Sequence, residues 1–266
     1  MKNNMKYKFD KKEHVHTLNG KPLTGTSSVI NVLSKPLTYW ASGLACECFG
    51  WLNPKKHEND AVQNALRSGF EMVKALDLDS YASLLDRAYR AHATKLKEAA
   101  ATGTDLHAEL ERFVKWSMGK DVVKVGVFDP KIHPFIDWAN LNVKRFIASE
   151  AHCYSERLWV GGIVDAVAEL NDGSYAVIDF KSSKEAYPGQ FIQAAGYAIQ
   201  IMENGLFSED GKHSKKLDKN IASLIVVPFG ATKVEPYIRN NVDEYSKAFE
   251  SVVGLYRLLG MEYEKS

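Results

Sequence analysis

Two periodicities of hydrophobic residues divide this chain into a helical part and a strand-rich part. Between residues 38 and 148, apolar side chains recur mostly every three or four positions, which is typical of amphipathic helices. The predicted helices cover 38–52, 61–75, Asp79 or Ser80 to about 101, 105–118 and 130–148. Gly103 is expected to break the helical pattern, Thr104 to cap the helix that follows, and Pro130 to open the last helix.

From residue 151 the period changes to two, which predicts the strands of a sheet. These strands are expected at 151–159, 162–170, 174–181, 221–228 and 231–238. A helix opened by Pro188 should run to about 204, and a final helix should cover 241–259. The glycine- and charge-rich stretch 205–219 is predicted to be an exposed loop.

The N-terminus predicts a hairpin over 5–23, with Asn19-Gly20 as a tight turn. Ser27 and Ser28 are expected to cap a short helix that ends before Pro36. A helix-rich first half followed by strand–strand–strand–helix–strand predicts an α/β fold. We expect an N-terminal hairpin and helical region, residues 1–100, and a core formed by residues 101–266.

Composition removes several classes of protein. The chain has 266 residues, 45% of them hydrophobic, which is enough for a full core, and its net charge of +1 argues against a polybasic binder. No apolar run approaches the roughly 18 residues that span a bilayer, and none follows the charged N-terminus as in a signal peptide. Cys46, Cys48 and Cys153 fit neither a disulfide framework nor a four-thiolate cluster, which favours a cytoplasmic, reducing compartment.

The candidate chemistry gathers on two neighbouring strands that carry Asp165, Asp179 and Lys181. Asp179 and Lys181 are two residues apart on one strand and share a face. If Asn171-Asp172-Gly173 forms a three-residue loop, Leu170 pairs with Ser174 and Asp165 lies opposite Asp179. A two-residue loop would place the two carboxylates on opposite faces of the sheet, so we predict the three-residue loop.

Two aspartates this close are costly to ionise together unless a cation lies between them. Oxygen ligands suit Mg²⁺ or Mn²⁺, and Lys181 beside the metal could activate a water or stabilise charge on a phosphate. The competing interpretation is a surface ion pair between Asp179 and Lys181 on an edge strand. The apolar neighbours Ala176-Val177-Ile178 and Phe180 favour a buried strand instead.

Two further pairs of residues lie one helical turn apart and therefore share a face. His107 could add a nitrogen ligand, with Glu111 in a secondary role, although a helical histidine is more often packed or exposed. Gln193 and Tyr197 could hydrogen-bond the lysine, an attacking water or a phosphate. A tyrosine packed on the sheet, with a glutamine at its rim, explains that second pair equally well.

Taken in order, these motifs resemble the PD-(D/E)XK nuclease superfamily, and within it the RecB-like exonuclease branch. The match covers roughly residues 100–230: Gly103-Thr104-x-x-His107 with Glu111, Gly161/Gly162-x-x-Asp165, Asp179-x-Lys181 and Gln193-x-x-x-Tyr197. The N-terminal segment, from Asn19-Gly20-Lys21-Pro22-Leu23 through Trp40-Ala41, is similar to that of phage-encoded exonucleases of this branch. The mitochondrial genome maintenance exonuclease is a more distant relative.

The resemblance implies a restriction-endonuclease-like core, a mixed central sheet flanked by helices. It implies that His107, Asp165, Asp179 and the backbone carbonyl of Phe180 hold Mg²⁺ or Mn²⁺. Lys181 would be the catalytic lysine, supported by Gln193 and Tyr197. The chain departs from the branch in carrying Asp179 where glutamate is more frequent, and its three cysteines cannot hold the iron–sulfur cluster of some members.

The resemblance also implies a DNA exonuclease that acts on ends of single- or double-stranded DNA and leaves a 5′-phosphate, in phage-type recombination, repair or replication. It leaves room for a recombination or replication protein as a partner. The candidate DNA contacts are basic residues outside the motifs: Arg90, Lys95, Lys97, Lys184 and the lysines within 212–219. The alternatives are a restriction-type endonuclease on the same fold, a non-catalytic nucleic-acid-binding protein and a hydrolase of small phosphate esters.

Overall fold

The computed structural model describes residues 6–34, 37–120, 128–230 and 233–260, and within helix α4 the side chains of 99–104 are outside the description. The chain divides into two units, and we consider each by itself. The core unit comprises Met1–Ser34 and Gly103–Ser266, and the helical unit comprises Lys35–Thr102. The predicted boundary near residue 100 therefore lies close to the observed one, but the N-terminal hairpin belongs to the core.

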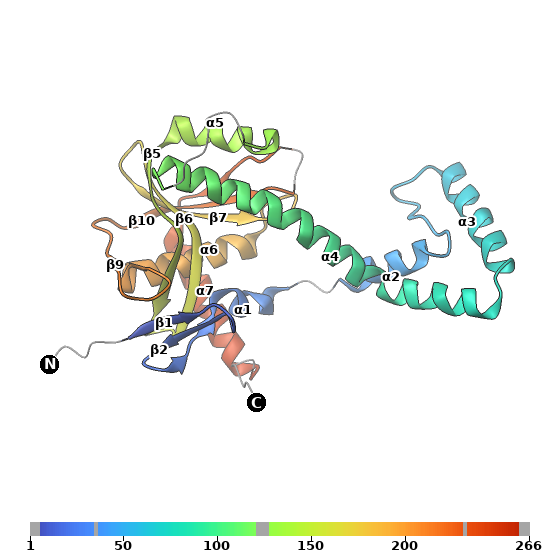
Figure 1. Cartoon of the computed structure of the whole chain (residues 1–266), viewed down its shortest axis with the longest axis horizontal. Coiled ribbons are helices and arrows are strands. Elements are labelled where there is room, and N and C mark those ends of the chain that lie inside the picture. The colour runs from blue at the N-terminus through green and yellow to red at the C-terminus, as the bar shows by residue number, and fades with distance from the viewer. Residues whose placement is uncertain (1–5, 35–36, 121–127, 231–232, 261–266) are drawn as a thin grey trace. The chain divides into compact units, whose positions relative to one another are not determined.

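The helical unit contains α2 (Thr38–Glu47), α3 (Asn59–Lys74) and the first part of α4 (Leu78–Ser117) (Figure 1). Helix α2 ends earlier than the predicted residue 52, and Gly50 follows with a φ of 83°, a left-handed conformation that glycine adopts easily. The predicted caps of α4 are wrong, because the side chain of Asp77 accepts a hydrogen bond from the backbone N–H of Ser80 (2.8 Å).

Helix α4 continues through Gly103, so the predicted break there is wrong. The three alanines at 99–101 are the strongest helix formers, and one glycine costs a helix only about 1 kcal/mol relative to alanine. The predicted helix 105–118 is the last part of α4 and lies in the core unit.

A mixed sheet forms the centre of the core unit, and its order among the described strands is β11-β10-β7-β6-β5-β8-β9. Its strands are β5 (Val143–Ser155), β6 (Val160–Leu170), β7 (Tyr175–Lys181), β8 (Leu206–Phe207), β9 (Ser214–Lys215), β10 (Ile221–Pro228) and β11 (Tyr237–Arg239). Strands β5, β6 and β7 are antiparallel neighbours, whereas β10 runs parallel to β7. Helix α6 (Pro188–Asn204) makes the crossover that this parallel pair requires.

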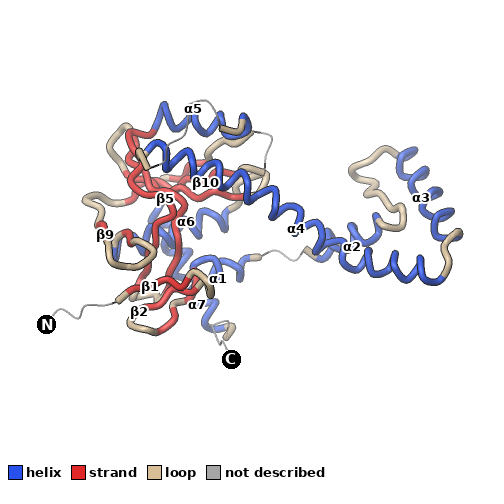
Figure 2. The backbone as a smooth tube through the Cα atoms, in the orientation of Figure 1, coloured by secondary structure: helices blue, strands red, loops and turns tan. Residues whose placement is uncertain are grey.

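Helices cover both faces of this sheet, as Figure 2 shows by colour. On one face α6 packs against the strands through Phe191, Ala194 and Ile201. On the other face the last part of α4 and helix α5 (His133–Asn142) contribute Leu110, Phe113 and Phe135. Helix α7 (Val242–Leu258) packs against α6. The predicted α/β class, with a mixed central sheet flanked by helices, is confirmed.

The predicted helix 130–148 is wrong in its second half. A short 3₁₀ turn, η2 (Pro130–Ile132), leads into α5, which ends at Asn142, and β5 begins at the next residue. Phe146, Ile147 and Ala148 are buried on this strand, so packing against the sheet outweighs their helical spacing. The predicted loop 205–219 contains β8 and β9, and of the predicted strand 231–238 the residues 231–232 lie outside the described residues.

The N-terminal segment folds onto the core sheet. Its strands are β1 (Tyr7–Asp10), β2 (Val15–Leu18) and β3 (Lys21–Pro22), followed by β4 (Thr24–Gly25), which pairs with β6. Asn19 and Gly20 both have positive φ, which confirms the predicted tight turn. Tyr7, Leu18 and Leu23 pack against Tyr154 of β5, which explains why this segment belongs to the core.

Two short helical segments follow, α1 (Thr26–Ile30) and η1 (Asn31–Leu33). Ser27 and Ser28 lie inside α1 and do not cap it, because its N-cap is Gly25. No helix among the described residues is both long enough and apolar enough to cross a membrane.

Candidate functional site

The register of the β6–β7 hairpin is the one that the predicted three-residue loop requires. Ala166 pairs with Ile178 and Glu169 pairs with Tyr175. At the turn, the N–H of Leu170 donates to the carbonyl of Ser174 (2.8 Å), and Gly173 takes a left-handed φ of 80°. This register brings Asp165 and Asp179 toward each other at the open end of the hairpin.

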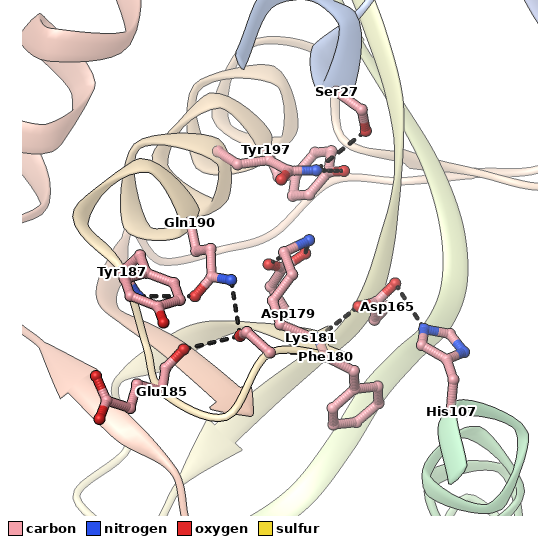
Figure 3. Close-up of polar contacts among 12 residues, drawn as sticks. Ser27, His107, Asp165, Asp179, Phe180, Lys181, Glu185, Tyr187, Gln190 and Tyr197 are labelled. Carbon is pink, nitrogen blue, oxygen red and sulfur yellow. Dashed lines mark hydrogen bonds and ion pairs between the residues drawn. The ribbon is translucent and has the colours of Figure 1, made fainter. Parts of the chain in front are cut away.

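Both aspartates line one cavity of about 330 Å³ in the core unit. Beyond the Ala166–Ile178 pair, a side chain replaces the backbone as hydrogen-bond acceptor between β6 and β7. The Oδ2 of Asp165 accepts a hydrogen bond from the backbone N–H of Phe180 (2.6 Å). Asp165 therefore lies between the two strands, with its other oxygen directed toward His107 (Figure 3). The predicted register of the hairpin is confirmed, and the two carboxylates line the same cavity.

Asp179 and Lys181 form an ion pair that is buried in the sheet. The ammonium of Lys181 lies 2.9 Å from Oδ1 and 2.7 Å from Oδ2 of Asp179. The side chain of Asp179 is only 2% exposed and that of Lys181 is 22% exposed, so the competing interpretation of a surface pair on an edge strand is wrong. Burial and the charge of Asp165 raise the pKa of Asp179 to about 7, although Lys181 opposes the shift.

Lys181 remains a cation in this setting. Burial alone would lower the pKa of its ammonium, but the negative charges of Asp179 and Asp165 outweigh it, and the net shift is upward. The lysine can therefore place a positive charge and N–H donors at the cavity.

His107 lies on α4 and lines the same cavity. It is near the oxygen of Asp165 that does not bind the N–H of Phe180. Its Nε2 lies 3.5 Å from Oδ1 of Asp165. The ring stands edge-on to Phe180 and Phe229, with centroids 5.7 and 6.1 Å away, which limits its rotation. Hydrogen bonding to Asp165 raises the pKa of His107, against the effect of burial.

Glu150 is a residue of this site that the sequence pattern did not reveal. It lies on β5 opposite Asp165, between the pairs Ser149–Ala166 and Ala151–Val164. One ligand atom from each of His107, Glu150 and Asp165 lies within 4.8 Å of the others. Its φ of 49° marks a local distortion of the strand. A glutamate inside the apolar stretch 146–151 was the available signal, but the predicted helix ended at 148 and the next strand began at 151.

Burial raises the pKa of Glu150 to about 7, and the charges of Asp165 and Glu111 add to the effect. Its Oε1 is buried without a hydrogen-bond donor among the described residues, and the same holds for Oδ2 of Asp179, whose contact with Lys181 is ionic. Buried carboxylate oxygens in this condition are what a bound cation would satisfy. Carboxylates with one imidazole are a donor set that fits Mn²⁺ or Mg²⁺.

Gln193 and Tyr197 form the wall of the cavity opposite His107. The amide of Gln193 donates to the hydroxyl of Tyr197 (2.8 Å) and to Oγ of Ser27 on α1 (3.1 Å). Both residues are buried, and burial raises the pKa of Tyr197 well above its ordinary value. Among the described contacts neither side chain hydrogen-bonds Lys181, so their predicted support of the lysine stays a prediction.

The adjacent glycines 161 and 162 allow two elements to approach β6 from opposite faces. A Cβ on Gly162 would lie 2.6 Å from Cε1 of Tyr197, and one on Gly161 would lie 2.9 Å from Cβ of His16. His14 and His16 of the N-terminal hairpin also line the cavity, which the sequence pattern did not indicate. Burial lowers the pKa of His16, so it is neutral, and its Nδ1 pairs with the hydroxyl of Tyr7.

The other predicted residues lie outside this constellation. Glu111 forms an ion pair with Lys115, one turn further along α4. Its effect on His107 is electrostatic, because its negative charge helps to raise the pKa of the imidazole. Lys184 is exposed in the segment after β7. Arg90 pairs with Asp86 and Lys95 pairs with Glu98, all in the helical unit. The backbone contact of Phe180 is made by its N–H, and a role for its carbonyl stays a prediction.

No protein-family model matches this chain, and no match was found among the curated proteins compared with it. The resemblance to PD-(D/E)XK nucleases therefore stays a prediction that rests on the motifs.

Proposed function

We propose that this protein is a metal-dependent deoxyribonuclease that hydrolyses phosphodiester bonds, and that it acts as an exonuclease. The observation that carries the proposal is the convergence of His107, Asp165, Asp179 and Lys181 on one cavity, in the hairpin register that the three-residue loop requires. These residues come from α4, β6 and β7, so the fold has brought together groups as far as 74 positions apart in sequence.

His107 and Asp165 would hold a divalent cation, together with a further carboxylate from the same cavity. A bound Mg²⁺ or Mn²⁺ would polarise the phosphoryl oxygen and lower the pKa of a water. The hydrogen bond from Phe180 N–H to Asp165 fixes the direction of that carboxylate, and the contact with His107 orients its second oxygen.

Lys181 would stabilise the negative charge that grows on the phosphate during attack by water. Its raised pKa favours this role over that of a general base, because the ammonium keeps its proton near neutral pH. The ion pair with Asp179 holds the ammonium at the cavity before the substrate arrives.

The choice of DNA and of an exonuclease rests on the resemblance, through the His107 helix and the Gln193–Tyr197 pair. A restriction-type endonuclease would use the same metal site. A non-catalytic nucleic-acid-binding protein is a weaker candidate, because Asp165, Asp179 and Lys181 are all present. Asp179 contacts Lys181, and Asp165 contacts His107.

The test is digestion of end-labelled single- and double-stranded DNA with Mg²⁺, with Mn²⁺ or with EDTA. We expect cleavage with either metal and none with EDTA. Asp165→Asn, purified in parallel, should be inactive, which excludes a contaminating nuclease. Binding of DNA without cleavage in every condition would contradict the proposal.

A second arm of the same experiment compares linear with covalently closed circular DNA. An exonuclease degrades the linear form and leaves the circle intact. Linearisation of the circle would instead identify an endonuclease on the same site.

A further inference from the structure

An exposed apolar stripe runs along the part of α4 that belongs to the helical unit. Each residue turns an α-helix by about 100°, so positions 78, 81, 85, 89 and 96 fall within an arc of about 80° on its surface. The buried residues Leu84 and Ala88 lie on a neighbouring face of the helix. Exposed apolar patches of this kind mark interaction sites. We call the following five residues, all of them exposed, the exposed stripe: Leu78, Tyr81, Leu85, Tyr89 and Leu96.

The charges beside the exposed stripe change sign at its middle. Segment 77–86 carries three acidic residues and no lysine or arginine: Asp77, Asp79 and Asp86. Segment 87–97 carries four basic residues and no aspartate or glutamate: Arg87, Arg90, Lys95 and Lys97. A surface with one acidic and one basic half is complementary to a second copy of itself turned end for end.

Asp79 and Lys97 illustrate why one helix alone does not satisfy this pattern. They lie on the same flank of the exposed stripe, 18 positions apart, which is about 27 Å along the helix. Neither side chain has an ion-pair partner among the described residues. In an antiparallel pair of α4 helices centred at residues 87 and 88, Asp79 of each copy comes to lie beside Lys97 of the other.

We propose that two copies of this chain associate through the exposed stripe, with their α4 helices antiparallel about a two-fold axis. Leu85 of one copy then packs against Tyr89 of the second copy, and the axis repeats the contact. At the two ends of the stripe, Leu78 packs against Leu96 of the second copy. A parallel pair would instead bring the two acidic halves together and the two basic halves together, which is unfavourable.

The same charges favour a second copy over nucleic acid as the occupant of the exposed stripe. A phosphate backbone would be attracted to segment 87–97 but repelled by the aspartates of segment 77–86. One pair of helices buries less than the roughly 1,600 Å² of a standard interface, so we expect a weak dimer that forms at about 100 µM and dissociates at about 1 µM.

Sedimentation velocity of the full-length protein across this range of concentrations measures the association. We expect the wild type to pass from monomer to dimer. Leu85→Lys places a charge beside the two-fold axis and should leave the protein monomeric throughout. Lysine is a good helix former and position 85 is exposed, so the circular dichroism of the variant should match that of the wild type.

A charge-reversal cycle tests the antiparallel arrangement. Asp79→Lys and Lys97→Asp should each weaken the dimer about tenfold, because an attraction becomes a repulsion at two symmetric places. The combined Asp79→Lys/Lys97→Asp variant should recover most of the wild-type affinity. The matched control is Asp60→Lys, the same change at an exposed aspartate in the first turn of α3, which should leave the dimer unchanged.

Zero-length carbodiimide cross-linking of the wild type gives a measurement that needs no variant. It couples a carboxylate to an amine only when the two are in contact. Asp79 and Lys97 are about 27 Å apart on one continuous helix, so an Asp79–Lys97 product must join two chains. We expect this product in the dimer band.

Three outcomes would overturn the proposal. The first is a wild-type protein that stays monomeric across the whole range of concentrations. The second is a dimer that Leu85→Lys leaves intact, or single charge reversals that the combined variant does not rescue. The third is cross-linking of Asp79 or Lys97 to the core unit of the same chain, which would identify that unit as the occupant. None of these measurements depends on the proposed nuclease function, because they use no DNA and no metal.

Discussion

Both the core unit and the helical unit contain amphipathic helices, yet the two units bury very different shares of their apolar side chains. In the core unit, apolar side chains of the sheet and of the helices on both its faces are almost fully buried. Within residues 37–98 of the helical unit, the buried apolar side chains are Val62, Leu84 and Ala88, whereas Tyr39 is 93% exposed and Tyr89 is 79% exposed. Amphipathic spacing therefore predicts a helix, but a sheet is what provides a surface on which to bury it.

The difference explains where the candidate chemistry lies. Groups that act together must be held within a few tenths of an ångström, which requires rigid and densely packed supports. In the core unit each site residue is on a strand or helix that is buried against its neighbours. Function and stability are therefore expected to be concentrated in the core unit.

The largest effect is expected for Lys181→Ala. Loss of the charge that stabilises the transition state should lower the cleavage rate by about 10³-fold, while the fold and Mn²⁺ binding remain. DNA cleavage, circular dichroism and metal titration measure the three quantities. Lys247→Ala, an exposed lysine on α7, is the control and should cleave normally. A rate near that of the wild type for Lys181→Ala would exclude the proposed mechanism.

Gly162→Ala should destabilise the core unit by about 1–3 kcal/mol. The added Cβ would lie 2.6 Å from the ring of Tyr197 and 2.8 Å from Oγ1 of Thr26, in a region where neither neighbour can move freely. Urea denaturation measures the free energy of unfolding. Gly254→Ala on α7 is the matched control, because nothing lies within 4 Å of its Cβ, and it should stabilise the protein by about 0.5–1 kcal/mol. Equal effects of the two changes would contradict the close packing at β6.

Gly69→Ala makes the corresponding test in the helical unit. Its Cβ would lie 2.1 Å from the carbonyl oxygen of Phe49 and 2.8 Å from the Cα of Gly50, so the chain must shift there. We expect faster hydrogen exchange within 37–98 and unchanged protection in β6 and β7. Faster exchange in both units would show that they do not unfold separately.

The stability of the metal-free protein should fall as pH rises from about 4.5 to about 7. The folded pKa of Glu150 is raised from 4.5 to about 7, so in this window the native state binds more protons than the unfolded chain. Asp179 acts in the same direction. Thermal melts in EDTA measure the slope, which Glu150→Gln should reduce and Glu185→Gln should leave unchanged. Stability that rises through this window, or a slope unaffected by Glu150→Gln, would be contrary to the expectation.

The smallest effect is expected for Tyr89→Ala in the helical unit. The side chain is 79% exposed, so its loss should change the free energy of unfolding by less than about 0.5 kcal/mol. Urea denaturation measures the difference, and Phe113→Ala in the core is the contrasting variant. Phe113 is 2% exposed, and its truncation should cost about 3–5 kcal/mol. A large loss for Tyr89→Ala would remove the contrast between the units.

Local signals in the sequence predicted much of the fold. Pro188 opens α6, and Asn19-Gly20 forms its turn, as expected. The signals failed where a segment carries both helical spacing and strand-forming residues. Residues 143–148 fit the helical pattern of the preceding segment but pack as the first part of β5, because only the assembled sheet decides between the two.

For the site, the sequence by itself determined the meeting of Asp165 and Asp179 in one cavity. A turn of known length fixes the register of a hairpin, and the register fixes which side chains share a face. The tertiary structure decided that Glu150 joins His107 and Asp165, and that Asp179 is engaged by Lys181. These two contacts depend on the placement of α4 and β5 and on the backbone distortion at Glu150. Both features arise from packing between segments that are distant in sequence, so they leave no periodic pattern in the chain.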